Sequence, residues 1–431
     1  MTQDMDAEFR AAIEVLVGEA RRLETDLDLQ HGIPYFDQRK DELIAGLPGY
    51  ARALEGMGRL EYSSMYGDNR RMVLAFVYSL LSNNGDALDD DAFTQAWNDL
   101  WVDFTSDVWT FYSVANLQYF SGDSGLFELR DGVTIRHRAF EELRELLKWG
   151  GHELTVLTED WMRGGGGSEY VILAKDERPK EPANLVLGGT GVGDTRILQM
   201  LLAARLHKPG AIGIGPIYHV RPSVLRLTGG MSSSLFDTPH FRSGGEYHFE
   251  TTDCGAVNSL FSTLEEFNSS YASSTSNVTL ALRRFSSSFE RSFGQAQDLV
   301  VDAVIALEAL LVPESDELAF RMAFRGSSIL ASEDIERREL FVTLRKYYGL
   351  RSRIVHGSSL TQAQVQTLQD TEPLRDILRR LLRAFLALTA STPLYRTGNG
   401  RGRFYKALDE TLLDAAMRAV LQDTMGLSAE A

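Results

Sequence analysis

Apolar residues recur three and four positions apart through the first part of the chain. This spacing places side chains on one face of an α-helix. The positions that show it are Phe9, Ile13, Leu16, Val17, Leu23, Met72, Phe76, Leu80, Phe93, Trp97, Leu100, Trp101 and Phe104. Turn-forming residues at 66–69 and 83–86 separate the apolar stretches. The pattern predicts a helical N-terminal region over residues 1–124.

Short apolar runs bounded by Gly, Pro and Ser replace this spacing from about residue 125. Such runs are typical of β-strands. They fall at residues 153–157, 170–173, 185–187, 211–214, 224–227 and 247–249. One helix is expected among them, at about 195–207. Residues 125–252 are therefore predicted to form a mixed α/β region.

Helical spacing returns after about residue 253 and continues to the C-terminus. In the segment 297–312 the residues that share one face are Leu299, Val300, Ala303, Val304, Leu307, Leu310 and Leu311, with Glu308 at its edge. In the segment 337–356 the apolar stripe comprises Leu340, Phe341, Leu344, Tyr348, Ile354 and Val355. Gly357 provides a stop after this helix, and Gly349 weakens it. Residues 253–431 are predicted to be helical, so the fold class is α+β.

The composition is that of an ordinary globular protein, with 44% hydrophobic and 24% charged residues. The one cysteine, Cys254, allows no intramolecular disulfide and no cysteine-based zinc site, which fits a reducing cytoplasm. The first 30 residues lack the pattern of a signal peptide, and no apolar run reaches membrane-spanning length. We therefore expect a cytoplasmic protein without a membrane partner.

The net charge of −16 argues against nucleic-acid binding, but the charge is unevenly distributed. Residues 278–395 hold 15 Lys and Arg against 14 Asp and Glu, so the remainder carries a net −17. Between Arg337 and His356 there are six basic residues and one acid. The acidity thus lies outside this segment.

Three sequence features occur in order in the C-terminal part: a basic segment at 282–291, the string ALEALL at 306–311, and LRSRIVHG at 350–357. A basic amphipathic helix at 374–388 follows them. This combination resembles the Apea-like subgroup of HEPN domains, over about residues 278–395. The resemblance implies a four- to five-helix bundle, and in many members a metal-independent endoribonuclease that acts in phage defence or as a toxin. It also implies a homodimer in which two Arg-x4–6-His motifs face each other.

The resemblance places the catalytic pair at Arg351 and His356 and a supporting acid at Glu308. Ser352 and Arg353 would support the motif, and Arg345 and Lys346 would bind RNA. A neutral histidine can take the proton of the RNA 2′-OH, and an arginine can hold the phosphorane charge. No metal or cofactor is then required, and the products are a 2′,3′-cyclic phosphate and a 5′-OH. Positions 351 and 356 lie about 140° apart around a helix, which independently favours a site shared between two chains.

Two other functions are compatible with the sequence. The first is a non-catalytic HEPN domain that serves as a dimerisation or RNA-binding scaffold. The second is a P-loop nucleotide binder, because residues 187–195 read LGGTGVGDT; however, Asp194 occupies the position of the phosphate-binding lysine. The basic stretch 396–406 could contact RNA, although an ordinary solvated loop is the simpler interpretation. His207, His219, His240 and His248 show no metal-ligand spacing.

Overall fold

The computed structural model describes residues 7–23, 38–59, 69–83, 90–137, 167–180, 192–220, 245–271, 277–289, 295–314, 316–391 and 398–427. The fold is mixed α+β, and 69% of the described residues are helical. The chain forms two compact units. Unit 1 comprises residues 1–117, 124–197 and 214–236, and unit 2 comprises 118–123, 198–213 and 237–431.

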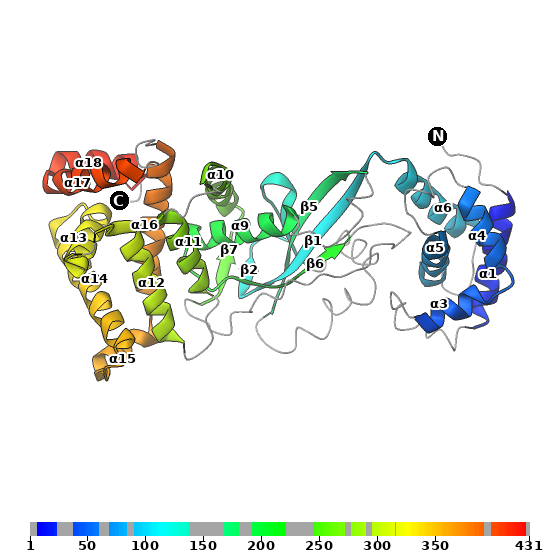
Figure 1. Cartoon of the computed structure of the whole chain (residues 1–431), viewed down its shortest axis with the longest axis horizontal. Helices are drawn as coiled ribbons and strands as arrows, with labels where there is room; N and C mark the ends of the chain where they lie inside the picture. The colour runs from blue at the N-terminus through cyan, green and yellow to red at the C-terminus, as the bar shows by residue number, and fades with distance from the viewer. Residues whose placement is uncertain are drawn as a thin grey trace. The chain divides into compact units, whose positions relative to one another are not determined.

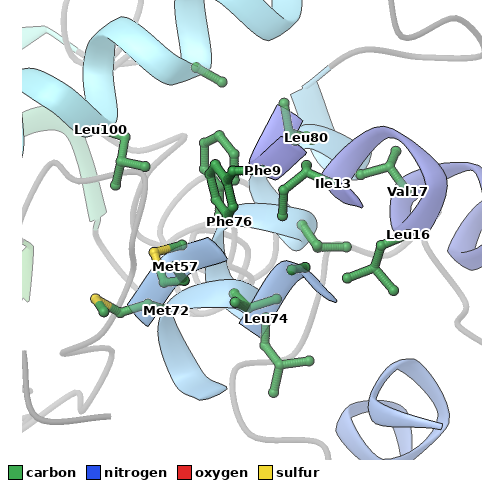
Figure 2. Packing of buried hydrophobic residues seen from close by; sticks show 14 of the residues in the cluster. Phe9, Ile13, Leu16, Val17, Met57, Met72, Leu74, Phe76, Leu80 and Leu100 are labelled. Atoms are coloured by element: carbon green, nitrogen blue, oxygen red, sulfur yellow. The ribbon is translucent and has the colours of Figure 1, made fainter. Parts of the chain in front are cut away.

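Unit 1 begins with helices whose apolar faces share one core. These helices are α1 (Ala7–Arg21), α3 (Gln38–Ala45), α4 (Tyr50–Arg59), α5 (Asn69–Asn83) and α6 (Asp90–Thr105). Figure 2 shows the core, in which the rings of Phe9 and Phe76 stack with their centroids 6.4 Å apart. Gly56 lets α4 approach α1 closely, because a Cβ there would lie 2.5 Å from the Phe9 ring. The predicted helical pattern is confirmed for the described residues up to Thr105.

The strands of unit 1 form a five-stranded sheet in the order β3-β4-β5-β1-β6. Their bounds are β1 (Val108–Gln118), β3 (Leu126–Glu128), β4 (Val133–His137), β5 (Gly167–Pro179) and β6 (Gly213–Val220). A 3-10 turn, η3 (Arg130–Gly132), joins β3 to β4, and β4 pairs antiparallel with both β3 and β5. The strands therefore begin at residue 108, earlier than the predicted change at residue 125.

The predicted strands of the middle region are confirmed in part. Residues 170–173 lie within β5, 211–214 overlap the start of β6, and 247–249 form β7 (Tyr247–Phe249). The predicted helix at 195–207 is α9 (Val192–His207). The predictions at 153–157, 185–187 and 224–227 fall outside the described residues.

Unit 2 contains a two-stranded parallel sheet, β2 (Phe120–Gly122) with β7, and a set of helices. The helices are α10 (Asp253–Tyr271), α11 (Asn277–Ser287), α12 (Ala296–Leu311), α13 (Leu318–Leu330), α14 (Asp334–Val355), α15 (Gln362–Gln369), α16 (Glu372–Ser391), α17 (Gly398–Leu413) and α18 (Ala415–Thr424). Helix α12 packs against α11, α13, α14, α15 and α16, so it forms the centre of the bundle (Figure 1).

The sequence identified the buried face of α12 correctly, because all seven predicted apolar residues are buried and Glu308 lies at the border. The face of α14 was predicted less well. Leu344 is buried as expected, but the other buried residues are Tyr347 and Leu350. Val355, which belongs to the predicted apolar stripe, is 53% exposed because it lies in the final turn.

A buried arginine joins three elements of unit 2. The guanidinium of Arg325 donates to Glu314 and Asp409 and to the carbonyl oxygen of Leu311, and it lies over the ring of Tyr405. Tyr405 is itself buried and donates to the carbonyl oxygen of Leu310.

The basic stretch 396–406 is not an ordinary loop over its described part, since residues 398–406 belong to α17.

Candidate active site

Helices α12 and α14 pack together and bring Glu308 next to Arg351. The Nη2 atom of Arg351 lies 3.6 Å from Oε2 of Glu308, and the side chains are 25% and 19% exposed. A separation of 3.6 Å is an ion pair but exceeds a normal hydrogen bond. The pairing of the two residues predicted for the site is therefore present but loose.

The polar atoms of this pair are incompletely satisfied. Among the described residues, the buried Nε of Arg351 and the buried Oε1 of Glu308 have no hydrogen-bond partner. Burial raises the pKa of Glu308 above its ordinary value, and the positive charge of Arg351 opposes part of this rise. The Arg351 side chain is one quarter exposed and makes no hydrogen bond to a described residue, so its Nη groups, unlike the buried Nε, can donate to an anionic oxygen atom.

His356 follows the last residue of α14 and is exposed. The helix ends in a Schellman motif, in which Gly357 N–H donates to the Ile354 carbonyl and Ser358 N–H to the Arg353 carbonyl. Gly357 has φ +66°, the left-handed conformation that glycine adopts without strain. The predicted stop at Gly357 is confirmed, and it fixes the backbone that carries His356.

Arg351 and His356 leave α14 in different directions. Five residues separate them, which corresponds to about 140° around the axis. The side chain of Arg351 reaches α12, whereas the side chain of His356 is exposed. The described contacts do not bring the two side chains together within one chain.

The other predicted residues lie on the outer side of α14 or near its end. Arg345 and Lys346 are exposed, and the Arg345 guanidinium lies 5.9 Å from the centre of the Phe341 ring. Arg353 is exposed and donates to the carbonyl oxygen of Ser359 over 3.2 Å. Ser352 is half-buried. None of these side chains forms a described contact with Arg351 or His356.

The sequence did not single out the exposed Arg338 on α14 or a polar cluster in unit 1. Arg338 is exposed on α14 seven residues before Arg345, a spacing that keeps both on one face. In unit 1 the Ser113 Oγ lies 3.1 Å from both Asp194 Oδ1 and His219 Nδ1. The His219 Nε2 lies 3.4 Å from Asp194 Oδ2. These three residues are distant in sequence, and no spacing could have grouped them.

The Ser113 cluster bears on the P-loop hypothesis. Asp194 lies in the first turn of α9, and its carboxylate accepts a hydrogen bond from Ser113. It therefore already has partners within unit 1 at the position where a P-loop has its phosphate-binding lysine. The glycine-rich residues 187–191 lie outside the described residues.

No protein-family model matches this chain, and neither does any curated protein or solved structure. Within the described part of the chain, no three His, Cys, Asp or Glu side chains gather so as to hold a metal ion. No described helix is both long and apolar enough to cross a membrane.

Proposed function

We propose that unit 2 contains an HEPN-type endoribonuclease domain of the Apea-like kind, within residues 278–395, that acts in phage defence or as a toxin. The observation that supports this most is the incompletely satisfied Arg351 on α14. Its side chain is 25% exposed and makes no hydrogen bond to a described residue, and its ion pair with Glu308 is long. By contrast, all five guanidinium N–H groups of Arg325 are used within the bundle. Arg351 thus retains donor capacity for a phosphate.

In the proposed reaction His356 takes the proton from an RNA 2′-OH. The 2′-oxygen forms a bond to the adjacent phosphorus, and the bond from phosphorus to the 5′-oxygen breaks. Arg351 stabilises the negative charge that develops on the phosphoryl oxygens. The leaving 5′-oxygen takes a proton from water, and the protonated His356 returns its proton to water, which gives a 2′,3′-cyclic phosphate and a 5′-OH. Glu308 positions the Arg351 guanidinium and does not contact substrate.

The side chain of His356 is exposed, whereas that of Arg351 lies against Glu308 of α12. A site shared between two chains therefore suits these positions better than a site within one chain. We therefore propose a two-fold homodimer through residues 278–395, in which Arg351 of one chain acts with His356 of the other. Two-fold symmetry then produces two such sites.

The catalytic assignment is tested with purified protein, total cellular RNA and end-group analysis. Arg351→Ala and His356→Ala should each lower cleavage about 10²–10⁴-fold, the usual cost of losing such a group. Arg283→Ala and His248→Ala are matched controls at exposed positions. Cleavage should persist in EDTA. Near wild-type cleavage by either site variant, or strict dependence of the chemical step on Mg²⁺, would refute the mechanism.

The shared site is tested by mixing the two inactive variants. Random pairing of Arg351→Ala and His356→Ala chains makes about half the dimers mixed, and each mixed dimer has one intact site. About a quarter of the wild-type activity should therefore return. If the mixture stays inactive although the chains exchange, an Arg351 and a His356 from different chains do not form the site.

A non-catalytic HEPN scaffold is the second candidate. The observation that favours it is the separation of Arg351, which contacts Glu308, from the exposed His356. A scaffold would bind RNA or dimerise without cleaving, and both site variants would then behave as the wild type. The same end-group assay distinguishes the two functions.

A further inference from the structure

The exposed face of α14 carries cations with no ion-pair partner among the described residues. These are Arg338, Arg345, Lys346 and Arg353. Arginines on the neighbouring helices behave differently, since Arg325 and Arg379 have ion pairs of 3.0 Å or less. On α14 itself, Arg337 lies outside this face and pairs with Asp334 at 2.9 Å. Unpaired positive charge is thus concentrated on the helix that ends at the proposed catalytic histidine.

These cations share one side of the helix with His356. Arg338 and Arg345 are seven residues apart, and so are Lys346 and Arg353, which is about two turns. His356 is eleven residues beyond Arg345, about three turns on the same side. The exposed apolar residues Ile335 and Val342 lie on this face too. Glu339 is the exposed acid between Arg338 and Lys346.

The length of this face exceeds what one nucleotide can contact. At about 1.5 Å per residue, Arg338 lies about 27 Å along the helix from His356. Arg345 and Lys346 lie about 15 Å from it. Cations at such intervals match a polyanion that continues along the helix away from the cut, with its phosphates near the cations.

We infer that the outer face of α14 is a binding track for the RNA that flanks the scissile phosphate. The cation face comprises Arg338, Arg345, Lys346 and Arg353. This inference rests on the proposed function, since it takes His356 as the end of the track. It adds that Arg345 and Lys346 determine affinity rather than the rate of the chemical step, and that Arg338 is a further contact reached only by longer RNA.

The charge of this face is also compatible with the proposed dimer. Two copies of Arg338, Arg345 and Lys346 would repel each other if the whole faces met. A second chain can therefore approach at the His356 end, while the first four turns of α14 remain open to RNA. An acidic protein is the competing partner for such a face, and the binding experiment below separates the two.

The test measures binding of a fluorescent 20-nucleotide RNA to His356→Ala protein as a function of salt. For a single strand the slope of log K against log salt is about −0.7 per phosphate contact. Adding Arg345→Ala with Lys346→Ala should reduce the magnitude of the slope by about 1.4 and weaken binding roughly 25-fold at 0.1 M salt. Arg130→Ala with Arg283→Ala removes the same charge from exposed positions outside α14 and should leave the slope unchanged.

Kinetics of the catalytically competent protein supply the second readout. Arg345→Ala with Lys346→Ala should raise KM for the 20-nucleotide RNA and leave kcat at saturating RNA unchanged. Arg338→Ala should raise KM for this RNA but have no effect on a dinucleotide substrate, which cannot reach it. Equal effects on both substrates would overturn the assignment of Arg338.

The outcomes also separate this inference from the proposed function. RNA binding that depends on Arg345 and Lys346, without any cleavage, would support the track and refute the nuclease. Cleavage with an unchanged salt slope in the double variant would support the nuclease and overturn the track. If the His356→Ala protein does not bind RNA at all, the track is overturned, and an acidic protein becomes the partner to examine.

Discussion

Replacement of Arg325 by methionine should destabilise unit 2 strongly. Arg325 is 0% exposed, and its guanidinium makes five hydrogen bonds to Glu314, Asp409 and the Leu311 carbonyl. These bonds join α13 to the segment after α12 and to α17. Methionine fills much of the same volume but offers no donor.

The expected loss can be worked out from the exposure of the partners. Breaking a fully buried ion pair by removing one member typically costs about 3–5 kcal/mol. Glu314 and Asp409 are 35% and 34% exposed, so water can replace part of what they lose. The Leu311 carbonyl loses its bond from Arg325, which adds about 1 kcal/mol or more. We expect a decrease of about 3 kcal/mol in the free energy of unfolding of unit 2.

Arg321 provides a matched control one turn earlier on α13. It pairs with the same two carboxylates at 3.7 Å and is 32% exposed, so Arg321→Met should cost less than about 1 kcal/mol. All five tryptophans lie in residues 97–161 of unit 1. Unfolding of unit 2 should therefore be followed by hydrogen exchange of peptides from α12, α13 and α17. Equal losses in the two variants would refute the reasoning from burial.

Three further predictions concern single residues. Gly357→Ala places a side chain at φ +66° and should cost about 1–2 kcal/mol, measured as faster exchange at the end of α14. Gly193→Ala puts a Cβ 2.4 Å from Ser113 Oγ and should lower the unfolding midpoint of unit 1 seen by tryptophan fluorescence. Burial raises the pKa of Glu308, and Arg351 opposes part of this rise, so the folded state binds this proton more tightly than the unfolded state. The stability of the wild type relative to Glu308→Gln should therefore fall as pH rises above 4.5, and a relative stability that rises instead would contradict this assignment.

The helices could be predicted because their apolar faces repeat over several turns. Leu299, Val304 and Leu311 on α12 illustrate this, since all are buried as the spacing requires. The apolar repeat predicted the ends of the helices less accurately than their buried faces. Val355 belongs to the apolar pattern but lies in the last turn of α14, where no further helical turn covers it.

The strand β1 was missed because it does not alternate simply. Its residues are exposed and buried in turn only at the start, and Ser113 to Leu117 are all buried. A continuous buried run is expected for a strand covered on both faces, and periodicity cannot distinguish it from a buried helix. The aromatic and β-branched residues of Val108–Val114 were the available signal.

The candidate site shows where sequence-based inference stops. The order of the sequence motifs predicted that Glu308 and Arg351 belong to one site. The packing of α12 on α14 places Oε2 of Glu308 and Nη2 of Arg351 3.6 Å apart. The incomplete satisfaction of this pair could not be read from the sequence, because it depends on which other donors and acceptors lie nearby. The Ser113 contacts with Asp194 and His219 likewise arise only from the fold.

The directions in which Arg351 and His356 leave the axis of α14 determine whether one chain can use both in the proposed reaction. The two residues are about 140° apart around the helix, the Arg351 side chain lies against Glu308 of α12, and the backbone of His356 is held by the helix end. In the proposed mechanism one phosphate needs both groups, and they can come from two chains or from one chain whose backbone moves after Arg353. The second route would break the Ser358 N–H bond to the Arg353 carbonyl and remove the reason for glycine at position 357. The two-chain site leaves this helix end intact, and for that reason it is the arrangement that we propose.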